Sequence, residues 1–256
     1  MSDVWENIPG PAGRLAVHVA PGSAAPGAAT PTLVVCHGLP VEPGSARRTG
    51  RSFPALADRL AAESGWRVVT GCLRGVGMSS GDFSMAGWLE DLGALVDRAA
   101  SLANGAQVRV AGFGTSGALA LCLAKRDDRI GGVACLGAPG SFSEWAVDLP
   151  RMLALCREVG IVQTPGFPGS AADLAAWGAP LSNLHPESAA AALGTRPVLI
   201  VHGADDDSVP VGDARVLAER AGPSAELRIL AGAGHRLRAD PRAVAILVGW
   251  LDRGTG

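Results

Sequence analysis

One stretch of the chain decides the fold, Ala111-Gly112-Phe113-Gly114-Thr115-Ser116-Gly117-Ala118. The apolar run 108–111 has the character of a short buried strand, and residues 118–125, ALALCLAK, are good helix formers. The glycines between them favour a tight change of direction, because glycine adopts backbone conformations that other residues avoid. The stretch therefore predicts a strand, a sharp turn and a helix.

The glycine spacing matches the G-x-S-x-G pattern, in which a nucleophilic serine stands on such a turn. Counting from Gly112 places that position at Gly114. A serine there needs a positive φ, which costs a non-glycine residue about 1–3 kcal/mol, whereas glycine adopts it almost freely. Gly114 thus suits the turn but supplies no hydroxyl.

Two neighbouring hydroxyls are alternative nucleophiles. In the register 114–118, which reads G-x-S-x-A, Ser116 takes the nucleophile position, and Thr115 is the second alternative. If the turn stays at Gly114, Ser116 lies two residues further and points about 200° away, at about 100° per helical residue. Its role is then that of a small side chain between helix and strand.

The rest of the chain alternates apolar runs with helical patterns, which indicates a doubly wound, mostly parallel sheet in a single domain, residues 1–256. Ligands bind at the carboxyl ends of the strands in such sheets. A weakly alternating segment, 15–19, predicts an outer strand that forms a first hairpin through the turn 21–31. The expected buried strands are 32–36, 67–70, 108–111, 132–136, 197–201 and 227–230, and the expected helices are 53–64, 84–102, 115–125, 213–221 and 240–251.

One interval, 139–196, interrupts this alternation because it contains no strand pattern. We interpret it as a small helical cap inserted late in the chain. Trp145 and Met152 are its candidate contacts with a substrate. The alternative is a surface excursion without a role in a pocket.

Four further motifs follow predicted strands in chain order. His37-Gly38-Leu39-Pro40 follows the strand 32–36, and the turn 74–81 reads RGVGMSSG. The segment 202–210 reads HGADDDSVP, and 231–236 reads AGAGHR. The carboxyl ends of parallel strands meet at one edge of a sheet, so these motifs should converge there.

Together with 111–118, these motifs resemble the α/β-hydrolase superfamily across nearly the whole chain, in particular serine hydrolases of the dienelactone-hydrolase or S33 aminopeptidase type. The resemblance implies a triad order of nucleophile, acid and base, with Gly114 at the nucleophile position, Asp206 as acid and His235 as base. Asp205 and Asp207 flank Asp206 and are alternative partners of the histidine.

The resemblance also implies an oxyanion hole and a substrate pocket. The backbone N–H groups of Leu39 and Thr115 would bind the oxyanion, and the latter opens a helix whose positive end favours negative charge. His37 and Gly38 are expected at the pocket, although His37, like His202, is also a candidate for a purely structural role in its loop.

Composition excludes several classes of function. The 256 residues are 48% hydrophobic and 18% charged, with a net charge of −2, which predicts a globular protein without nucleic-acid or membrane partners. The N-terminal sequence has no secretory pattern, so we expect a cytoplasmic location. Five cysteines without a C-x-x-C pair indicate reduced core thiols and no metal site, and no cofactor is expected. Oligomeric state stays open.

Three interpretations of function remain. Ser116 or Thr115 replaces the nucleophile, or His235 with Asp206 acts directly as a general base, or the protein binds a small molecule without turnover. We expect a hydrolase with a degenerate triad and weak or non-standard activity toward small esters or related carbonyl compounds. A non-catalytic binding or regulatory protein is the alternative.

Overall fold

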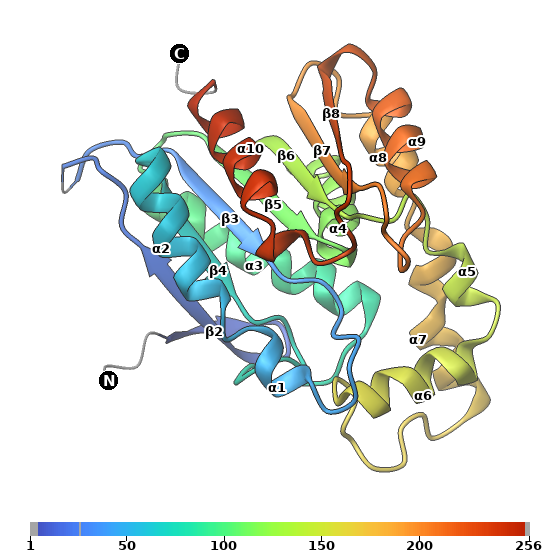
Figure 1. Cartoon of the computed structure of the whole chain (residues 1–256). Coiled ribbons are helices and arrows are strands. Elements are labelled where there is room, and N and C mark those ends of the chain that lie inside the picture. The colour runs from blue at the N-terminus through green and yellow to red at the C-terminus, as the bar shows by residue number, and fades with distance from the viewer. Residues whose placement is uncertain (1–4, 26, 254–256) are drawn as a thin grey trace.

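The computed structural model describes residues 5–25 and 27–253 of the chain. Eight strands form one sheet in the order β1-β2-β4-β3-β5-β6-β7-β8, in which β2 runs antiparallel to its neighbours and β3 to β8 are mutually parallel (Figure 1). The strands are β1 (Glu6–Gly10), β2 (Gly13–Ala20), β3 (Thr32–Cys36), β4 (Arg67–Gly71), β5 (Val108–Phe113), β6 (Ile130–Leu136), β7 (Val198–Gly203) and β8 (Ala225–Leu230). This is the α/β-hydrolase fold that the sequence predicts.

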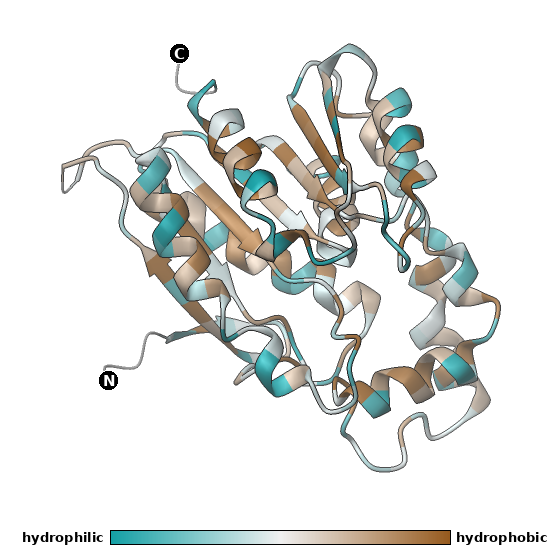
Figure 2. Cartoon of the chain, in the orientation of Figure 1, coloured by the Kyte–Doolittle hydropathy of each residue, from teal (hydrophilic) through white to brown (hydrophobic). Residues whose placement is uncertain are grey.

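The sheet separates two hydrophobic cores, because successive side chains of a strand point to opposite faces. Val34 and Val110 contribute to the core under one set of helices, and Leu33 and Ala111 contribute to the core under the other. The central strands β3, β5 and β7 are buried along their whole length, which explains their continuous apolar sequences. Figure 2 shows this concentration of apolar residues in the central strands.

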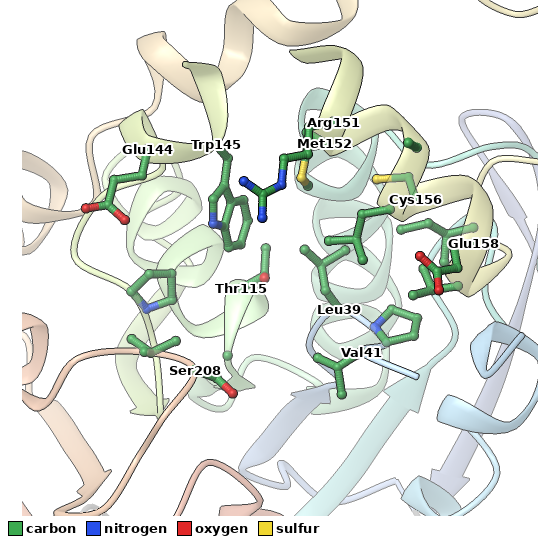
Figure 3. Close-up of a pocket in the computed structure, with 18 of the residues that line it drawn as sticks. Leu39, Val41, Thr115, Glu144, Trp145, Arg151, Met152, Cys156, Glu158 and Ser208 are labelled. Atoms are coloured by element: carbon green, nitrogen blue, oxygen red, sulfur yellow. The ribbon is translucent and has the colours of Figure 1, made fainter. Parts of the chain in front are cut away.

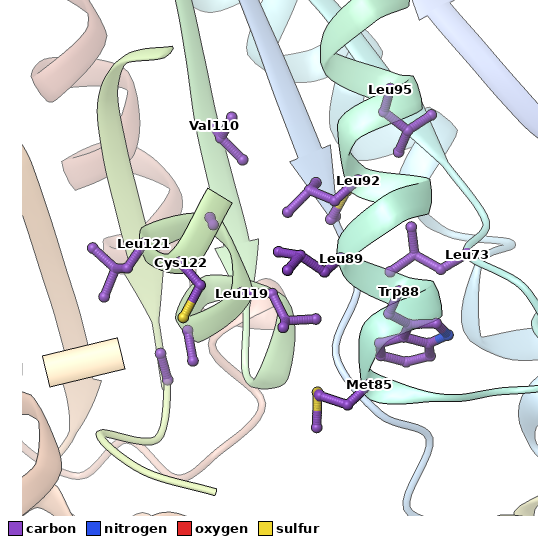
Figure 4. Packing of buried hydrophobic residues seen from close by; sticks show 14 of the residues in the cluster. Leu73, Met85, Trp88, Leu89, Leu92, Leu95, Val110, Leu119, Leu121 and Cys122 are labelled. Atoms are coloured by element: carbon purple, nitrogen blue, oxygen red, sulfur yellow. The ribbon is translucent and has the colours of Figure 1, made fainter. Parts of the chain in front are cut away.

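Helices cover both faces of the sheet. Residues of α2 and α10 form one core with the sheet, and residues of α3, α4 and α9 form the other. In Figure 4, Leu89 and Leu92 of α3 face Leu119 of α4 and Val110 of β5. The bounds are α1 (Ala46–Thr49), α2 (Phe53–Ser64), α3 (Met85–Ala103), α4 (Thr115–Ala124), α9 (Val211–Ala221), η1 (Gly222–Ser224), η2 (Leu237–Ala239) and α10 (Pro241–Asp252).

The first hairpin differs from the prediction. The strand β2 contains the expected segment 15–19, but it pairs with β1 and β4, and not with β3. The hairpin turn lies between Gly10 and Gly13. The sequence does not reveal β1, because this strand is largely exposed and carries no alternating apolar pattern.

Four helices lie between β6 and β7, in the interval of the expected cap: α5 (Ser143–Ala146), α6 (Leu149–Val159), α7 (Ala171–Asn183) and α8 (Pro186–Ala191). Figure 1 shows α5, α6 and α7 grouped at one end of the sheet. The indole Nε1 of Trp177 donates to the carbonyl of Phe83 at 2.9 Å and joins α7 to the segment before α3. By contrast, α8 packs against α4 and α9, among the helices that cover the sheet.

None of the helices in the two described ranges is long and apolar enough to span a bilayer.

Candidate active site

The turn between β5 and α4 is formed by Gly114, whose φ of 53° and ψ of −126° suit glycine alone without strain. Its N–H donates to the carbonyl of Leu136 at the end of β6, at 2.9 Å. A Cβ built on Gly114 lies 3.7 Å from Nε2 of His235 and 3.7 Å from Cα of Gly38, which are ordinary contact distances. The turn therefore faces the imidazole and has room for a small side chain.

The two outer glycines of the stretch allow the helix to begin directly on the strand. A Cβ on Gly112 would lie 2.3 Å from the backbone N of Gly117, and a Cβ on Gly117 would lie 2.7 Å from the carbonyl O of Gly112. Neither position accepts a side chain without movement of the backbone. These glycines are required by the close approach of α4 to β5.

His235 and Asp206 form a hydrogen-bonded pair beside this turn. Nδ1 of His235 is 2.9 Å from Oδ2 of Asp206, and the Asp206 side chain is fully buried whereas that of His235 is 26% exposed. Oδ1 of Asp206 accepts the N–H groups of Ser208 and Val209, each at 2.9 Å. An Nδ1–H donor to the carboxylate leaves the Nε2 lone pair directed at Gly114.

These contacts keep Asp206 ionised. Burial raises the pKa of its carboxyl, but hydrogen bonds from the Val209 N–H, from His235 and from the Ser208 N–H outweigh burial and hold the pKa below its ordinary value. Asp205 and Asp207 are exposed, and the Asp207 carboxylate accepts the Ser208 hydroxyl. Asp206 is therefore the carboxylate that meets His235.

His202 is a further member of this cluster, which sequence reasoning considered only as a loop residue. It is fully buried at the end of β7, and its Nε2 lies 3.2 Å from Oδ2 of Asp206 and 3.0 Å from the carbonyl of Val209. Nδ1 has no hydrogen-bond partner in the described structure, so His202 makes its polar contacts through Nε2 alone. The sequence feature that could have indicated this contact is the position of His202 four residues before Asp206.

Ser116 does not reach the pair. Its side chain is fully buried, and its hydroxyl donates to the carbonyl of His37 at 2.5 Å. This position does not support the alternative register, in which Ser116 is the nucleophile. The turn lies at Gly114, and Ser116, two residues further along the helix, points away from His235.

His37 and Gly38 also lie outside the pocket, contrary to expectation. His37 is fully buried, where its Nε2 accepts the N–H of Leu73 at 3.1 Å and its Nδ1 donates to the carbonyl of Gly38 at 2.9 Å. Burial lowers the pKa of His37 to about 4, although the Gly38 hydrogen bond opposes this. Gly38 passes so close to β5 that a Cβ would lie 2.8 Å from the carbonyl O of Phe113.

The motif 74–81 builds the fold and does not contribute to the pair. The guanidinium of Arg74 binds the buried carboxylate of Asp91 through Nη2 at 2.8 Å and through Nε at 3.0 Å. Trp88 donates its Nε1–H to the carbonyl of Arg74 at 2.9 Å. This network fixes the start of α3 against the loop after β4.

A cavity of about 820 Å³ opens beside the pair, between the strand ends and the helices α5 and α6. Leu39 and Thr115 line it, together with Trp145 of α5 and Met152 of α6 (Figure 3). Within the described residues, neither the N–H of Leu39 nor that of Thr115 donates to another group of the protein. No three His, Cys, Asp or Glu side chains of the described residues are grouped so as to hold a metal ion.

Comparisons with solved structures agree with this architecture. An α/β serine hydrolase homologue from Coxiella burnetii superposes with a TM-score of 0.64 at 19% identity, over 100% of this chain and 99% of that one. Est1E from Butyrivibrio proteoclasticus gives a TM-score of 0.70 at 19% identity, over 98% of this chain and 97% of that one. A meta-cleavage product hydrolase from Pseudomonas fluorescens gives 0.68 at 17% identity, over 98% of each chain.

At these identities the structures show the fold alone. No curated protein matches the sequence. The sequence model of the alpha/beta hydrolase family matches residues 33–246, which include every strand from β4 to β8, the turn at Gly114 and the pair of Asp206 and His235. The chain belongs to the alpha/beta hydrolase family.

Proposed function

We propose that this chain has a degenerate catalytic triad, in which Gly114 occupies the nucleophile position and Asp206 and His235 are retained. It acts as a slow hydrolase of small esters or related carbonyl compounds, with His235 as a general base on water. One observation carries the proposal: Nε2 of His235 lies 3.7 Å from where a Cβ of residue 114 would be. A water molecule in that space would be within reach of the base.

In this mechanism Nε2 of His235 accepts a proton from the water as the water oxygen attacks the carbonyl carbon. The buried Asp206 carboxylate stabilises the imidazolium that forms. The N–H groups of Leu39 and Thr115 donate to the carbonyl oxygen as it becomes negative. The tetrahedral intermediate then expels the alcohol, which takes the proton from the imidazolium, so no covalent acyl-enzyme forms.

The expected rate is low. General-base catalysis contributes about 10²–10⁴ in rate, whereas loss of the nucleophile from a triad costs about 10⁶ in kcat.

The same glycine favours a second candidate, a non-catalytic protein that binds a small molecule in the cavity. The two candidates differ in whether ester turnover depends on His235.

The test compares the wild type with His235→Ala and Gly114→Ser on 4-nitrophenyl butyrate, and measures labelling by a fluorophosphonate. We expect slow wild-type hydrolysis that falls about 10²-fold in His235→Ala, and no label on the wild type. Gly114→Ser should take up the label, because its hydroxyl would lie beside His235. His185→Ala, an exposed histidine at the start of α8, is the matched control.

Labelling of the wild type would show that a side-chain hydroxyl such as that of Thr115 acts as nucleophile. Hydrolysis that survives His235→Ala would contradict the general-base mechanism. A wild type that does not exceed the buffer rate would favour the binding protein.

A further inference from the structure

One arginine lines the cavity, the exposed Arg151. Arg151 lies in the first turn of α6, where its backbone N–H donates to Oδ1 of Asp148 at 3.0 Å and fixes the start of the helix. Its guanidinium makes no hydrogen bond or ion pair with any residue that the structure describes. Figure 3 shows this group directed into the cavity, toward Thr115.

None of the three carboxylates that line the cavity forms an ion pair with Arg151. Asp148 is engaged as the cap of α6. In Figure 3, Glu144 and Glu158 lie at opposite edges of the cavity, away from the guanidinium. By contrast, Arg236, next to the active-site histidine, pairs with Glu42 at 2.6 Å. Arg151 is therefore the arginine that remains available to an anion inside the cavity.

Apolar side chains form most of the cavity wall. Leu39, Met152 and Ile161 line the cavity, and Val41 and Leu155 extend it outward, where they are 59% and 44% exposed. An apolar ligand body would remove these side chains from water, at about 25 cal/mol per Å² of apolar surface. The cavity thus combines a largely apolar wall with one arginine that has no ion pair among the described residues and with three carboxylates, those of Glu144, Asp148 and Glu158.

The geometry points to a substrate that carries a carboxylate as well as the reacting carbonyl group, separated by an apolar body. Arg151 is the specificity-determining residue that binds the carboxylate, because a guanidinium matches its two oxygens with parallel N–H donors. The assignment of a reacting carbonyl rests on the proposed function. The carboxylate site itself does not.

A binding experiment tests the site independently of turnover. Hexanoate and hexanamide have similar shape but differ in charge, and calorimetry compares their affinities for wild type, Arg151→Gln, Arg151→Lys and Arg215→Gln. We expect the wild type to bind hexanoate about tenfold more tightly than hexanamide, because a partly exposed charge-assisted hydrogen bond contributes about that factor to affinity. Arg151→Gln should abolish this preference and Arg151→Lys should retain part of it. Arg215, an exposed arginine of α9, is the matched control.

Equal affinity of the wild type for the two ligands would overturn the assignment, as would a preference that survives in Arg151→Gln. A second experiment measures turnover of esters, which contain the reacting carbonyl group. It compares kcat/KM for 4-nitrophenyl hydrogen glutarate, which carries a carboxylate, with kcat/KM for the uncharged 4-nitrophenyl valerate. Arg151→Gln should lower kcat/KM about tenfold for the anionic ester alone, whereas His235→Ala should lower it for both. If the wild type hydrolyses neither ester, the proposed function fails, and the hexanoate comparison still decides the role of Arg151.

Discussion

At the scale of single residues, Asp206 accepts three hydrogen bonds and has His202 as a fourth close neighbour. The N–H groups of Ser208 and Val209 hold one oxygen, and His235 and His202 approach the other at 2.9 and 3.2 Å. We propose that His202 is a positioning residue, which keeps the carboxylate aimed at His235. Its own ring is fully buried and does not line the cavity.

Replacing His202 should therefore affect the chemical step. We expect His202→Leu to lower kcat for 4-nitrophenyl butyrate about tenfold with little change in KM, because the 3.2 Å polar contact with the Asp206 carboxylate and the hydrogen bond to the Val209 carbonyl are both lost. His202→Gln, whose amide can donate to the same oxygen, should recover most of the activity. A rise in KM with unchanged kcat, or no rescue by Gln, would contradict a positioning role.

The sequence alone could predict that Asp206 and His235 meet, because each stands at a fixed place in a motif that follows a strand, although β8 before His235 is only partly buried. It could not decide the direction of Ser116 or His37. Both depend on which backbone carbonyl or N–H lies next to them in the folded chain, and those groups come from residues 36 to 79 positions away. Arg151 was missed because only the placement of α6 over the strand ends brings it into the cavity.

At the scale of elements, the junction of β5 and α4 depends on Gly112. Gly112→Ala places a Cβ 2.3 Å from the backbone N of Gly117, and such overpacking costs typically about 1–3 kcal/mol. We expect the free energy of unfolding in urea to fall by about that amount. The control is Gly93→Ala within α3, where a Cβ meets nothing within 4 Å and should be neutral or slightly stabilising. Equal stability of the two variants would refute this explanation of the motif.

Long periodic elements were predictable for a physical reason. The expected helix 53–64 coincides with α2 (Phe53–Ser64), because its apolar residues recur on one face and Pro54 and Gly65 mark its ends. The strand β1 was not predictable, because it is held by pairing with β2 and not by burial of its side chains. Where tertiary pairing supplies the stability, the local sequence carries no signal.

For the whole molecule, His37 links stability to pH. Burial lowers its pKa from 6.5 to about 4 in the folded protein, so between these values the unfolded chain binds the additional proton. The contribution of neutral His37 is complete above pH 6.5 and decreases as the pH falls toward 4. From pH 7 to pH 5 we expect the free energy of unfolding to drop by about 2 kcal/mol.

Urea titrations at the two pH values measure this drop, and His37→Gln should remove most of it. Asp206 does not contribute within this window, because its lowered pKa matters only below the ordinary carboxyl value of 3.8. A drop of the same size in His37→Gln would assign the effect to other groups.

The backbone at Gly114 has one more consequence, which concerns the history of the site. Glycine adopts the positive φ of this turn without the strain that any other residue would have. A chain that does not need a hydroxyl at position 114 therefore has a higher free energy of unfolding with glycine than with serine. If the proposed function holds, a glycine at position 114 stabilises the turn and also removes the need for a hydroxyl there. A return to serine would have to be selected for chemistry against the preference of the fold, which favours lasting retention of the glycine.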